Sequence, residues 1–260
     1  MIFWQQSGNG EVLVLLHGIS SGSACWHKQL HDVALQQQCR MLAWDAPGYG
    51  DSKPLPTPQP NAGDYADALA RMLDAAEIQR ISLLGHSLGA LMAAAFAARY
   101  PQRVQRLVLA DPAQGYGSQP AEKRQSILSQ RQQQMALGTE QMAATRAVKL
   151  LRPDADERDI VTVASSMRNL KPGGFLQAAA MLAEDDIRRW LADCQTPLEV
   201  WCGQLDVITP AVQAEALATT LGCRFVPIPH AGHASYLDNA AFFNQQLLRW
   251  LTGAEYGSKD

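Results

Sequence analysis

The chain has 260 residues, of which 47% are hydrophobic and 18% are charged; this composition excludes a disordered protein and predicts one large domain or one domain with a sizeable insertion. The 22 Lys and Arg residues against 25 Asp and Glu residues give a net charge of −3 and form no basic cluster, which argues against a nucleic-acid partner. The longest apolar stretch, Leu88 to Ala98, is too short to cross a bilayer, which needs about 20 residues.

Six short apolar segments predict buried β-strands. Each is rich in aliphatic and β-branched residues, is too short for a helix and ends at a cluster of turn-forming residues. In chain order they are residues 11–16, 40–44, 80–84, 104–109, 198–202 and 224–228. Residues 1–6 precede the turn Gly8-Asn9-Gly10, and we expect them to add an antiparallel strand at the edge of the sheet.

Longer segments with apolar residues at spacings of three and four lie between these strands and predict helices. They cover residues 64–76, 88–100, 210–221 and 240–251. An alternation of buried strands and helices is typical of a parallel sheet that is covered on both faces. The sequence therefore predicts an α/β fold with a mostly parallel sheet of about seven or eight strands.

One long region departs from this alternation. Between the strands at 104–109 and 198–202, the chain is rich in Gln, Ala, Met and Arg, and its period is helical over residues 122–137, 140–151, 156–169 and 174–183. We expect residues 1–112 and 195–260 to form the core of the fold and residues 113–194 to form a helical cap over one end of the sheet. The proline-rich run 54–60 is interpreted as a surface loop within the core.

The segment Gly85-His86-Ser87-Leu88-Gly89 follows a predicted strand directly and opens a predicted helix. A serine nucleophile placed on a strained strand-to-helix turn needs this layout, because glycines two residues before and two after it let the backbones pass closely. The G-x-S-x-G pattern alone is weakly specific, and its position between strand and helix is what makes it informative. We predict Ser87 as the nucleophile.

A serine hydroxyl needs a base to remove its proton, and the usual base is a histidine held by a carboxylate. With a serine at such a turn, the acid and then the histidine follow in chain order at the ends of later strands. Asp206 follows the predicted strand 198–202 and His233 follows the strand 224–228, so we predict these two as acid and base. Asp111 is the alternative acid and His230 the alternative base.

The tetrahedral intermediate of acyl transfer carries a negative oxygen, which two backbone N–H groups stabilise. Leu88 is predicted to supply one, because it follows the nucleophile at a helix N-terminus where the helix dipole is favourable. The second is expected from the loop after the strand 11–16, which begins His17-Gly18. Ile19 is predicted as this donor, with Ser20 as the alternative.

These segments together resemble the α/β-hydrolase superfamily, in its serine hydrolase branch, over nearly the whole chain. A weaker likeness to enol-lactone hydrolases and small carboxylesterases comes from residues 171–178 and 186–191, and residues 111–117 faintly resemble hydrolases that cleave C–C bonds in aromatic degradation. The main resemblance is carried by Leu15-Leu16-His17-Gly18, by residues 45–52, by Gly85 to Gly89, by Tyr100 to Val104, by Gly203 to Pro210, and by Gly232-His233.

The resemblance implies a serine hydrolase that cleaves a small-molecule carboxylic ester or lactone through an acyl-enzyme intermediate. Serine at position 87 excludes the aspartate-dependent chemistry of dehalogenases and epoxide hydrolases. A C–C bond hydrolase, a cofactor-free perhydrolase and a protein that only binds its ligand stay open as alternatives. No organic cofactor or metal is expected, and the oligomeric state is not predicted.

The first residues, 1–6, show neither a basic segment nor an apolar core of signal-peptide length, and a cytoplasmic location is expected. The five cysteines are widely spaced and include no C-x-x-C pair, so we expect reduced thiols without a disulfide framework or a zinc site.

The predicted cap offers candidates for the substrate pocket. Four apolar residues at helical spacing could line it, although such residues more often form the core: Met142, Met167, Phe175 and Met181. Three arginines could pair with a substrate carboxylate, although solvated helix faces are the commoner explanation: Arg146, Arg152 and Arg168.

Overall fold

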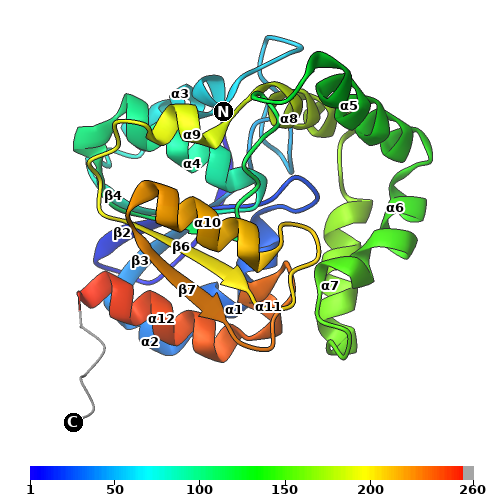
Figure 1. Cartoon of the computed structure of the whole chain (residues 1–260). Helices are drawn as coiled ribbons and strands as arrows, with labels where there is room; N and C mark the ends of the chain where they lie inside the picture. The colour runs from blue at the N-terminus through cyan, green and yellow to red at the C-terminus, as the bar shows by residue number, and fades with distance from the viewer. Residues whose placement is uncertain (254–260) are drawn as a thin grey trace.

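The computed structural model describes residues 1–253 and contains one seven-stranded sheet with the order β1-β3-β2-β4-β5-β6-β7 (Figure 1). Strand β1 pairs antiparallel with β3, and the other neighbours pair in parallel. The α/β fold class and the antiparallel edge strand are therefore confirmed. The strands are β1 (Trp4–Ser7), β2 (Glu11–Leu16), β3 (Cys39–Trp44), β4 (Ile81–His86), β5 (Val104–Ala110), β6 (Leu198–Gly203) and β7 (Arg224–Ile228).

The strands form where the sequence is apolar without alternation, because the sheet is buried on both faces. Every residue of β4 is buried, and the last four residues of β2, β5 and β6 are buried as well. A strand covered on both sides has no polar face to present to solvent. Because these strands run parallel, the loops after β2, β4, β6 and β7 lie at one edge of the sheet.

Helices cover both faces of the sheet (Figure 1). On one face lie α3, α4 and α10, and on the other lie α1, α2, α11 and α12. Helix α4 is buried over ten consecutive residues and is rich in alanine, so it packs closely between the sheet and α3. The helices are α1 (His27–Leu30), α2 (Val33–Gln38), α3 (Ala62–Ala75), α4 (Leu88–Arg99), α10 (Ala211–Leu221), α11 (Ser235–Asp238) and α12 (Ala240–Thr252), with short 3₁₀ turns η1 (Ser23–Trp26) and η2 (Pro101–Arg103).

Between β5 and β6 the chain forms only helices and one isolated antiparallel bridge, Gly115 to Asp186, which joins the beginning of this region to its end. The predicted helix over residues 140–151 is interrupted, because it changes to a 3₁₀ turn after Arg146. The helices are α5 (Ala121–Ala136), α6 (Thr139–Arg146), η3 (Ala147–Leu150), α7 (Glu157–Arg168), α8 (Pro172–Glu184) and α9 (Ile187–Leu191).

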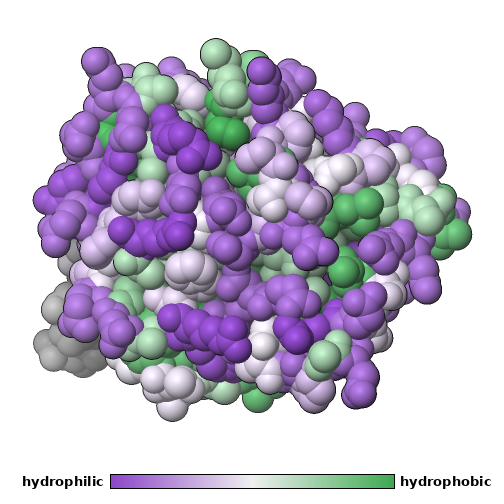
Figure 2. Space-filling model, turned by 90° about the horizontal axis from the view of Figure 1, so that it is seen from above, coloured by the Kyte–Doolittle hydropathy of each residue, from purple (hydrophilic) through white to green (hydrophobic). Residues whose placement is uncertain are grey.

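The last of these helices, α9, packs against α4 of the sheet-covering layer, whereas α5 packs on α8 and α6 on α7. In Figure 1, α5, α6 and α7 stand apart from the sheet at the end where β6 and β7 finish. Figure 2 shows that polar groups cover most of the upper face and that apolar groups gather toward the side of these helices. Exposed apolar residues of this region include Leu137, Val148 and Val161.

None of the helices described within residues 1–253 has the length and apolar character needed to cross a membrane.

Candidate active site

Ser87 lies at the tight turn between β4 and α4, with backbone angles of φ 53° and ψ −117°. A positive φ is unfavourable for a residue with a Cβ atom and is found where the surrounding structure enforces it. Here the Ser87 N–H donates to Ala110 O at 2.9 Å. A Cβ atom at Gly85 would lie 2.2 Å from Gly89 O, so only glycine lets strand and helix meet so closely.

The second glycine of the turn gives a stability prediction. A Cβ atom at Gly89 would lie 2.5 Å from the backbone oxygen of Leu16 in the neighbouring strand β2. Gly89→Ala should therefore lower the free energy of unfolding by about 2 kcal/mol or more, as overpacking in a rigid core does. Thermal and urea unfolding measure this.

Gly173→Ala is the matched control, since a Cβ atom there meets nothing within 4 Å in the first turn of α8. It should leave stability unchanged or raise it by about 0.5 kcal/mol, because alanine favours the helix. Equal unfolding midpoints for Gly89→Ala and the parent protein would contradict the close approach.

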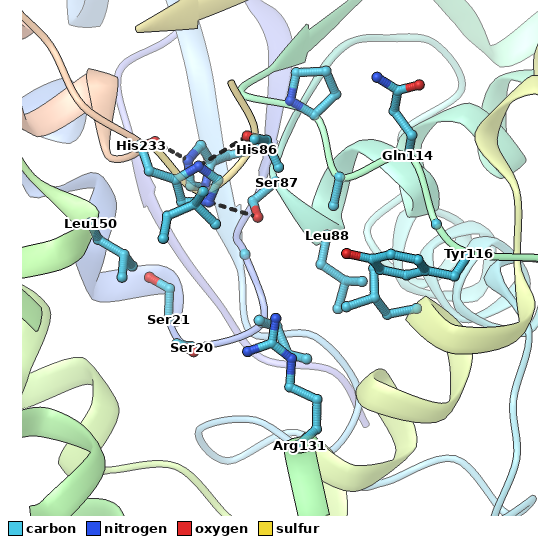
Figure 3. A pocket seen from close by; sticks show the side chains of 18 of the residues that line it. Ser20, Ser21, His86, Ser87, Leu88, Gln114, Tyr116, Arg131, Leu150 and His233 are labelled. Carbon is cyan, nitrogen blue, oxygen red and sulfur yellow. Dashed lines mark hydrogen bonds between the residues drawn. The ribbon is translucent and has the colours of Figure 1, made fainter. Parts of the chain in front are cut away.

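The three residues predicted as nucleophile, base and acid lie together at the carboxyl edge of the sheet. His233 Nε2 is 2.9 Å from Ser87 Oγ (Figure 3), and His233 Nδ1 is 2.8 Å from Asp206 Oδ2. Asp206 is fixed from its other side, because its Oδ1 accepts from the N–H groups of Ile208 and Thr209 at 2.7 and 3.0 Å. All three residues are buried.

This arrangement sets the proton positions on the His233 ring. Asp206 is a carboxylate and can only accept, so Nδ1 carries the proton and Nε2 presents its lone pair to the Ser87 hydroxyl. Burial alone lowers the pKa of His233, but the charge and hydrogen bond of Asp206 outweigh it and raise that pKa above the usual 6.5. Burial alone raises the pKa of Asp206, and the His233 charge reverses this and lowers it.

The structure separates the predicted base from its alternative. His230 is exposed and sits in a turn with φ 52°, whereas the hydrogen bond to Ser87 Oγ involves His233. His233, three residues later, lies where the chain returns to the sheet edge, and its backbone oxygen accepts from His86 Nε2 at 2.7 Å. The choice of His233 over His230 stays a prediction, and the short contact of His233 Nε2 with Ser87 Oγ supports it.

Asp111, the alternative acid, is fully buried next to Asp206 but faces other partners. Its Oδ1 accepts from the Gly203 N–H at 2.8 Å, and its Oδ2 accepts from the Ser235 hydroxyl at 2.5 Å. Burial, together with the negative charge of Asp206, raises the pKa of Asp111 to about 8. At neutral pH this side chain is therefore mostly a neutral carboxylic acid.

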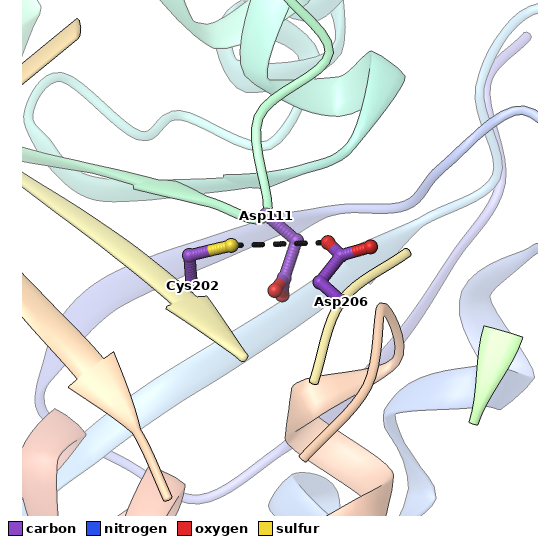
Figure 4. A group of neighbouring side chains, drawn as sticks. All are labelled: Asp111, Cys202 and Asp206. Atoms are coloured by element: carbon purple, nitrogen blue, oxygen red, sulfur yellow. Dashed lines mark hydrogen bonds between the residues drawn. The ribbon is translucent and has the colours of Figure 1, made fainter. Parts of the chain in front are cut away.

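Asp111, Asp206 and Cys202 form a compact buried group whose possible ligand atoms lie within 4.8 Å of one another (Figure 4). Protein groups already engage all four carboxylate oxygens, and Cys202 Sγ points to Asp206 Oδ2 at 3.8 Å. Burial raises the pKa of the Cys202 thiol far above its usual range. A neutral thiol and engaged oxygens do not suit a cation, so the group is interpreted as support for the acid.

The two predicted oxyanion donors line the same cavity as Ser87. The carbonyl oxygen of Gly18 accepts from His17 Nδ1 at 2.8 Å and from the Ser21 N–H at 3.2 Å. A trans peptide bond directs its N–H opposite to its carbonyl oxygen, so these bonds fix the direction of the Ile19 N–H. The proton of His17 is on Nδ1, since Nε2 accepts from the Ala46 N–H at 3.0 Å.

The same reasoning applies to Leu88. The Ser87 carbonyl oxygen accepts from the N–H groups of Ala90 and Ala113 at 3.0 and 3.1 Å, which orients the Leu88 N–H the opposite way. Ser20, the alternative donor, also lines the cavity, and the preceding carbonyl of Ile19 accepts from the Tyr49 hydroxyl at 2.9 Å. The choice of Ile19 over Ser20 stays a prediction.

The cavity has a volume of about 420 Å³ and lies between the sheet edge and the helices α5 to α8. None of the four apolar candidates from these helices lines it; Met142, Met167, Phe175 and Met181 are all core residues. The apolar lining comes instead from Leu150, Val163, Leu182 and Ile208 among others.

Sequence reasoning missed Arg131 and Tyr116, which both reach into the cavity (Figure 3). Arg131 lies on α5, a helix with polar residues on every side, so its period carries no signal for the inward face. Of the three arginines considered before, only Arg146 lines the cavity. Arg152 pairs with Asp154, and Arg168 pairs with Glu140 on the surface.

The family model of the alpha/beta hydrolase fold matches residues 11–240 of the chain. This chain belongs to the α/β-hydrolase family. It is 29% identical to a pimeloyl-[acyl-carrier protein] methyl ester esterase of Pectobacterium carotovorum, over 95% of this chain and 97% of the relative. It is 28% identical to the protein of the same name from Vibrio vulnificus, over 95% and 96%.

Among solved structures, this α/β hydrolase is similar to a thermophilic esterase from Thermogutta terrifontis, described as malate bound. The TM-score is 0.87 at 26% identity, and the match covers 97% of this chain and 93% of the other. The relatives are esterases, and the family assignment together with them makes this protein a hydrolase enzyme.

Proposed function

We propose that this α/β hydrolase cleaves a carboxylic ester or lactone through an acyl-enzyme intermediate. The observation that carries the proposal is the chain of two short contacts from Ser87 Oγ to His233 Nε2 and from His233 Nδ1 to Asp206 Oδ2, at 2.9 and 2.8 Å. The esterase activity named for two relatives of matching length supports the same reaction class.

The reaction follows from these positions. Ser87 Oγ attacks the carbonyl carbon while its proton passes to His233 Nε2, and Asp206 stabilises the imidazolium that forms. The Ile19 and Leu88 N–H groups stabilise the negative oxygen of the tetrahedral intermediate. His233 then returns the proton to the leaving alcohol oxygen. A water molecule repeats the sequence on the acyl-enzyme and releases the acid.

Residues 113–194 are proposed to form the cap of the site. Helices α5, α6, α7 and α8 each contribute to the cavity lining, and the Gly115–Asp186 bridge closes the base of the region. Regions of this kind select the substrate and limit water access, whereas the sheet edge supplies the chemistry. The small cavity volume favours a small-molecule substrate.

Rapid mixing with p-nitrophenyl acetate and p-nitrophenyl butyrate tests the proposed function, together with a panel of methyl esters and γ-lactones under steady-state conditions. We expect turnover of at least one class and, for an activated ester, a burst of nitrophenolate equal to the concentration of active sites. A protein that only binds such compounds would show neither. Absence of turnover across the panel would contradict the proposal.

The pH dependence follows from the raised pKa of His233. The base must be neutral to take the Ser87 proton, so kcat/KM should fall as the pH drops through the pKa of His233 in the free enzyme. Because that pKa lies above 6.5, the midpoint of the acid limb is expected above pH 6.5. A pH–rate profile between pH 5 and 9 measures it, and full activity down to pH 5.5 would contradict the assignment.

A further inference from the structure

The cavity at Ser87 has a one-sided charge distribution. Among the described residues that line it, four are cationic and none is Asp or Glu, although the whole chain has a net charge of −3. The four are Lys123, Arg131, Arg146 and Arg188. Lys123 is exposed, and Arg188 is engaged by Gln114 at 2.6 Å and lies 3.8 Å from Asp186.

Within residues 1–253, neither Arg131 nor Arg146 has an acidic partner, whereas four other cap arginines do: Arg124, Arg152, Arg168 and Arg188. The Nε atom of each is buried and makes no hydrogen bond to the described part of the chain. In that part of the chain, the one hydrogen bond of the Arg131 side chain is the donation of a guanidinium N–H to Gln134 on the same helix, at 3.0 Å. The two guanidinium groups thus have N–H donors that could bind a ligand inside the cavity.

Such a pair is unfavourable without an anion. Burial lowers the pKa of Arg131, and the neighbouring positive charge of Arg146 lowers it further. Removing a charge from water costs free energy, and a partner of opposite charge offsets this cost. An arginine fork also fits the two oxygens of a carboxylate or a phosphoryl group, with parallel hydrogen bonds.

Both arginines line the same cavity as Ser87 and His233. Figure 3 shows the Arg131 side chain reaching from its helix into the cavity, with its guanidinium group on the side of Ser20. The positive charge of Arg131 opposes part of the rise in the pKa of His233, which Asp206 causes, and in the pKa of Tyr49, which burial causes. The Tyr49 hydroxyl donates to the Ile19 carbonyl oxygen. An anion held there shares one small cavity with the scissile bond.

We propose that the substrate of this enzyme carries an anionic oxygen group, a carboxylate or a phosphoryl group, which Arg131 and Arg146 bind inside the cavity. The inference rests on the proposed ester or lactone hydrolysis at Ser87 and adds a substrate class to it. The ester or lactone that fits is therefore a half-ester or an acidic lactone, with its anion a short chain away from the carbonyl.

Matched methyl esters that differ only at the far end of the chain test this proposal. Monomethyl adipate ends in a carboxylate, methyl adipamate ends in a neutral carboxamide of the same shape, and methyl 5-phosphonopentanoate ends in a phosphonate. The enzyme should have a kcat/KM for at least one anionic ester that exceeds that for the amide by about 10- to 100-fold, the usual range for a hydrogen bond to a charged group. The preferred anion identifies the group.

Arg131→Gln and Arg146→Gln should each bring this anionic-to-neutral ratio toward one, and Arg131→Lys should retain part of it. Arg168→Gln is the control, because Arg168 pairs with Glu140 on the surface outside the cavity, and it should leave the ratio unchanged. Melting temperatures show whether each variant is folded. Equal kcat/KM values of the parent enzyme for the amide ester and for both anionic esters would overturn the proposal, while the proposed function would stand.

Calorimetry on the Ser87→Ala variant separates this proposal from the proposed function. Monomethyl adipate or the phosphonate should bind more tightly than methyl adipamate, and adding Arg131→Gln should reduce the difference. If the parent enzyme turns over no ester but this binding preference is found, the hydrolytic proposal fails and the anion site stands. Equal binding of all three compounds overturns the anion site.

Discussion

Replacing Ser87 with alanine is expected to lower kcat for any ester substrate by about 10³- to 10⁶-fold, the range found when the nucleophile of such a triad is removed. The reason is chemical, because the variant has no oxygen that can attack the carbonyl under the control of His233. The proposed oxyanion donors and the cavity remain, so substrate binding should persist. Steady-state kinetics with highly purified protein measure the loss.

Ser165→Ala is the matched control, since Ser165 is an exposed serine on α7 that does not line the catalytic cavity. Its kcat should equal that of the parent enzyme. The Ser87→Ala variant should also melt at or above the parent temperature, because alanine fits the space of serine. Parent-like turnover by Ser87→Ala would remove the nucleophile from the mechanism.

Asp206→Asn is expected to lower kcat by about 10³- to 10⁴-fold with little change in the fold. An asparagine that donates to His233 Nδ1 favours the tautomer with its proton on Nε2, which then cannot accept from Ser87. The charge that raises the pKa of His233 is also lost. The acid limb of the residual pH–rate profile should therefore move to lower pH, a shift that a merely structural defect does not produce.

Asp111→Asn tests the alternative acid under matched conditions. With its pKa raised to about 8, Asp111 is already mostly neutral at pH 7, and an amide can still accept from the Gly203 N–H. We expect kcat to stay within about 10-fold of the parent value, since only local hydrogen bonds change. The reverse order of effects, with Asp111→Asn inactive and Asp206→Asn active, would exchange the roles of the two carboxylates.

The sheet could be predicted from the sequence because its strands are buried on both faces. A buried parallel strand such as 11–16 or 224–228 is an uninterrupted apolar run with turn residues at its end, and both segments form strands with these bounds. The short helices α1, α2 and α11 were not predicted. Four- to six-residue helices have no full period to detect, and tertiary packing stabilises them.

The candidate active-site residues could be predicted because each one follows a predicted strand, and parallel strands bring their ends to one edge. The ends of the strands do not by themselves distinguish His233 from His230, because both follow the same strand. The placement of the two rings depends on a turn with positive φ at His230, which the sequence does not mark. Arg131 could not be found at all. The inward side of α5 is set by its packing against α8, and the few apolar residues of this polar helix do not mark that side in the sequence.

Mass spectrometry of the acid-quenched enzyme during turnover of an ester tests the central mechanism most directly. We expect the mass of the protein to increase by that of the acyl group, and we expect peptide mapping to place the group on Ser87 Oγ. The Ser87→Ala protein should show no adduct under the same conditions. Steady ester hydrolysis with no acyl adduct under any quench condition, or with the adduct on another residue, would contradict the mechanism.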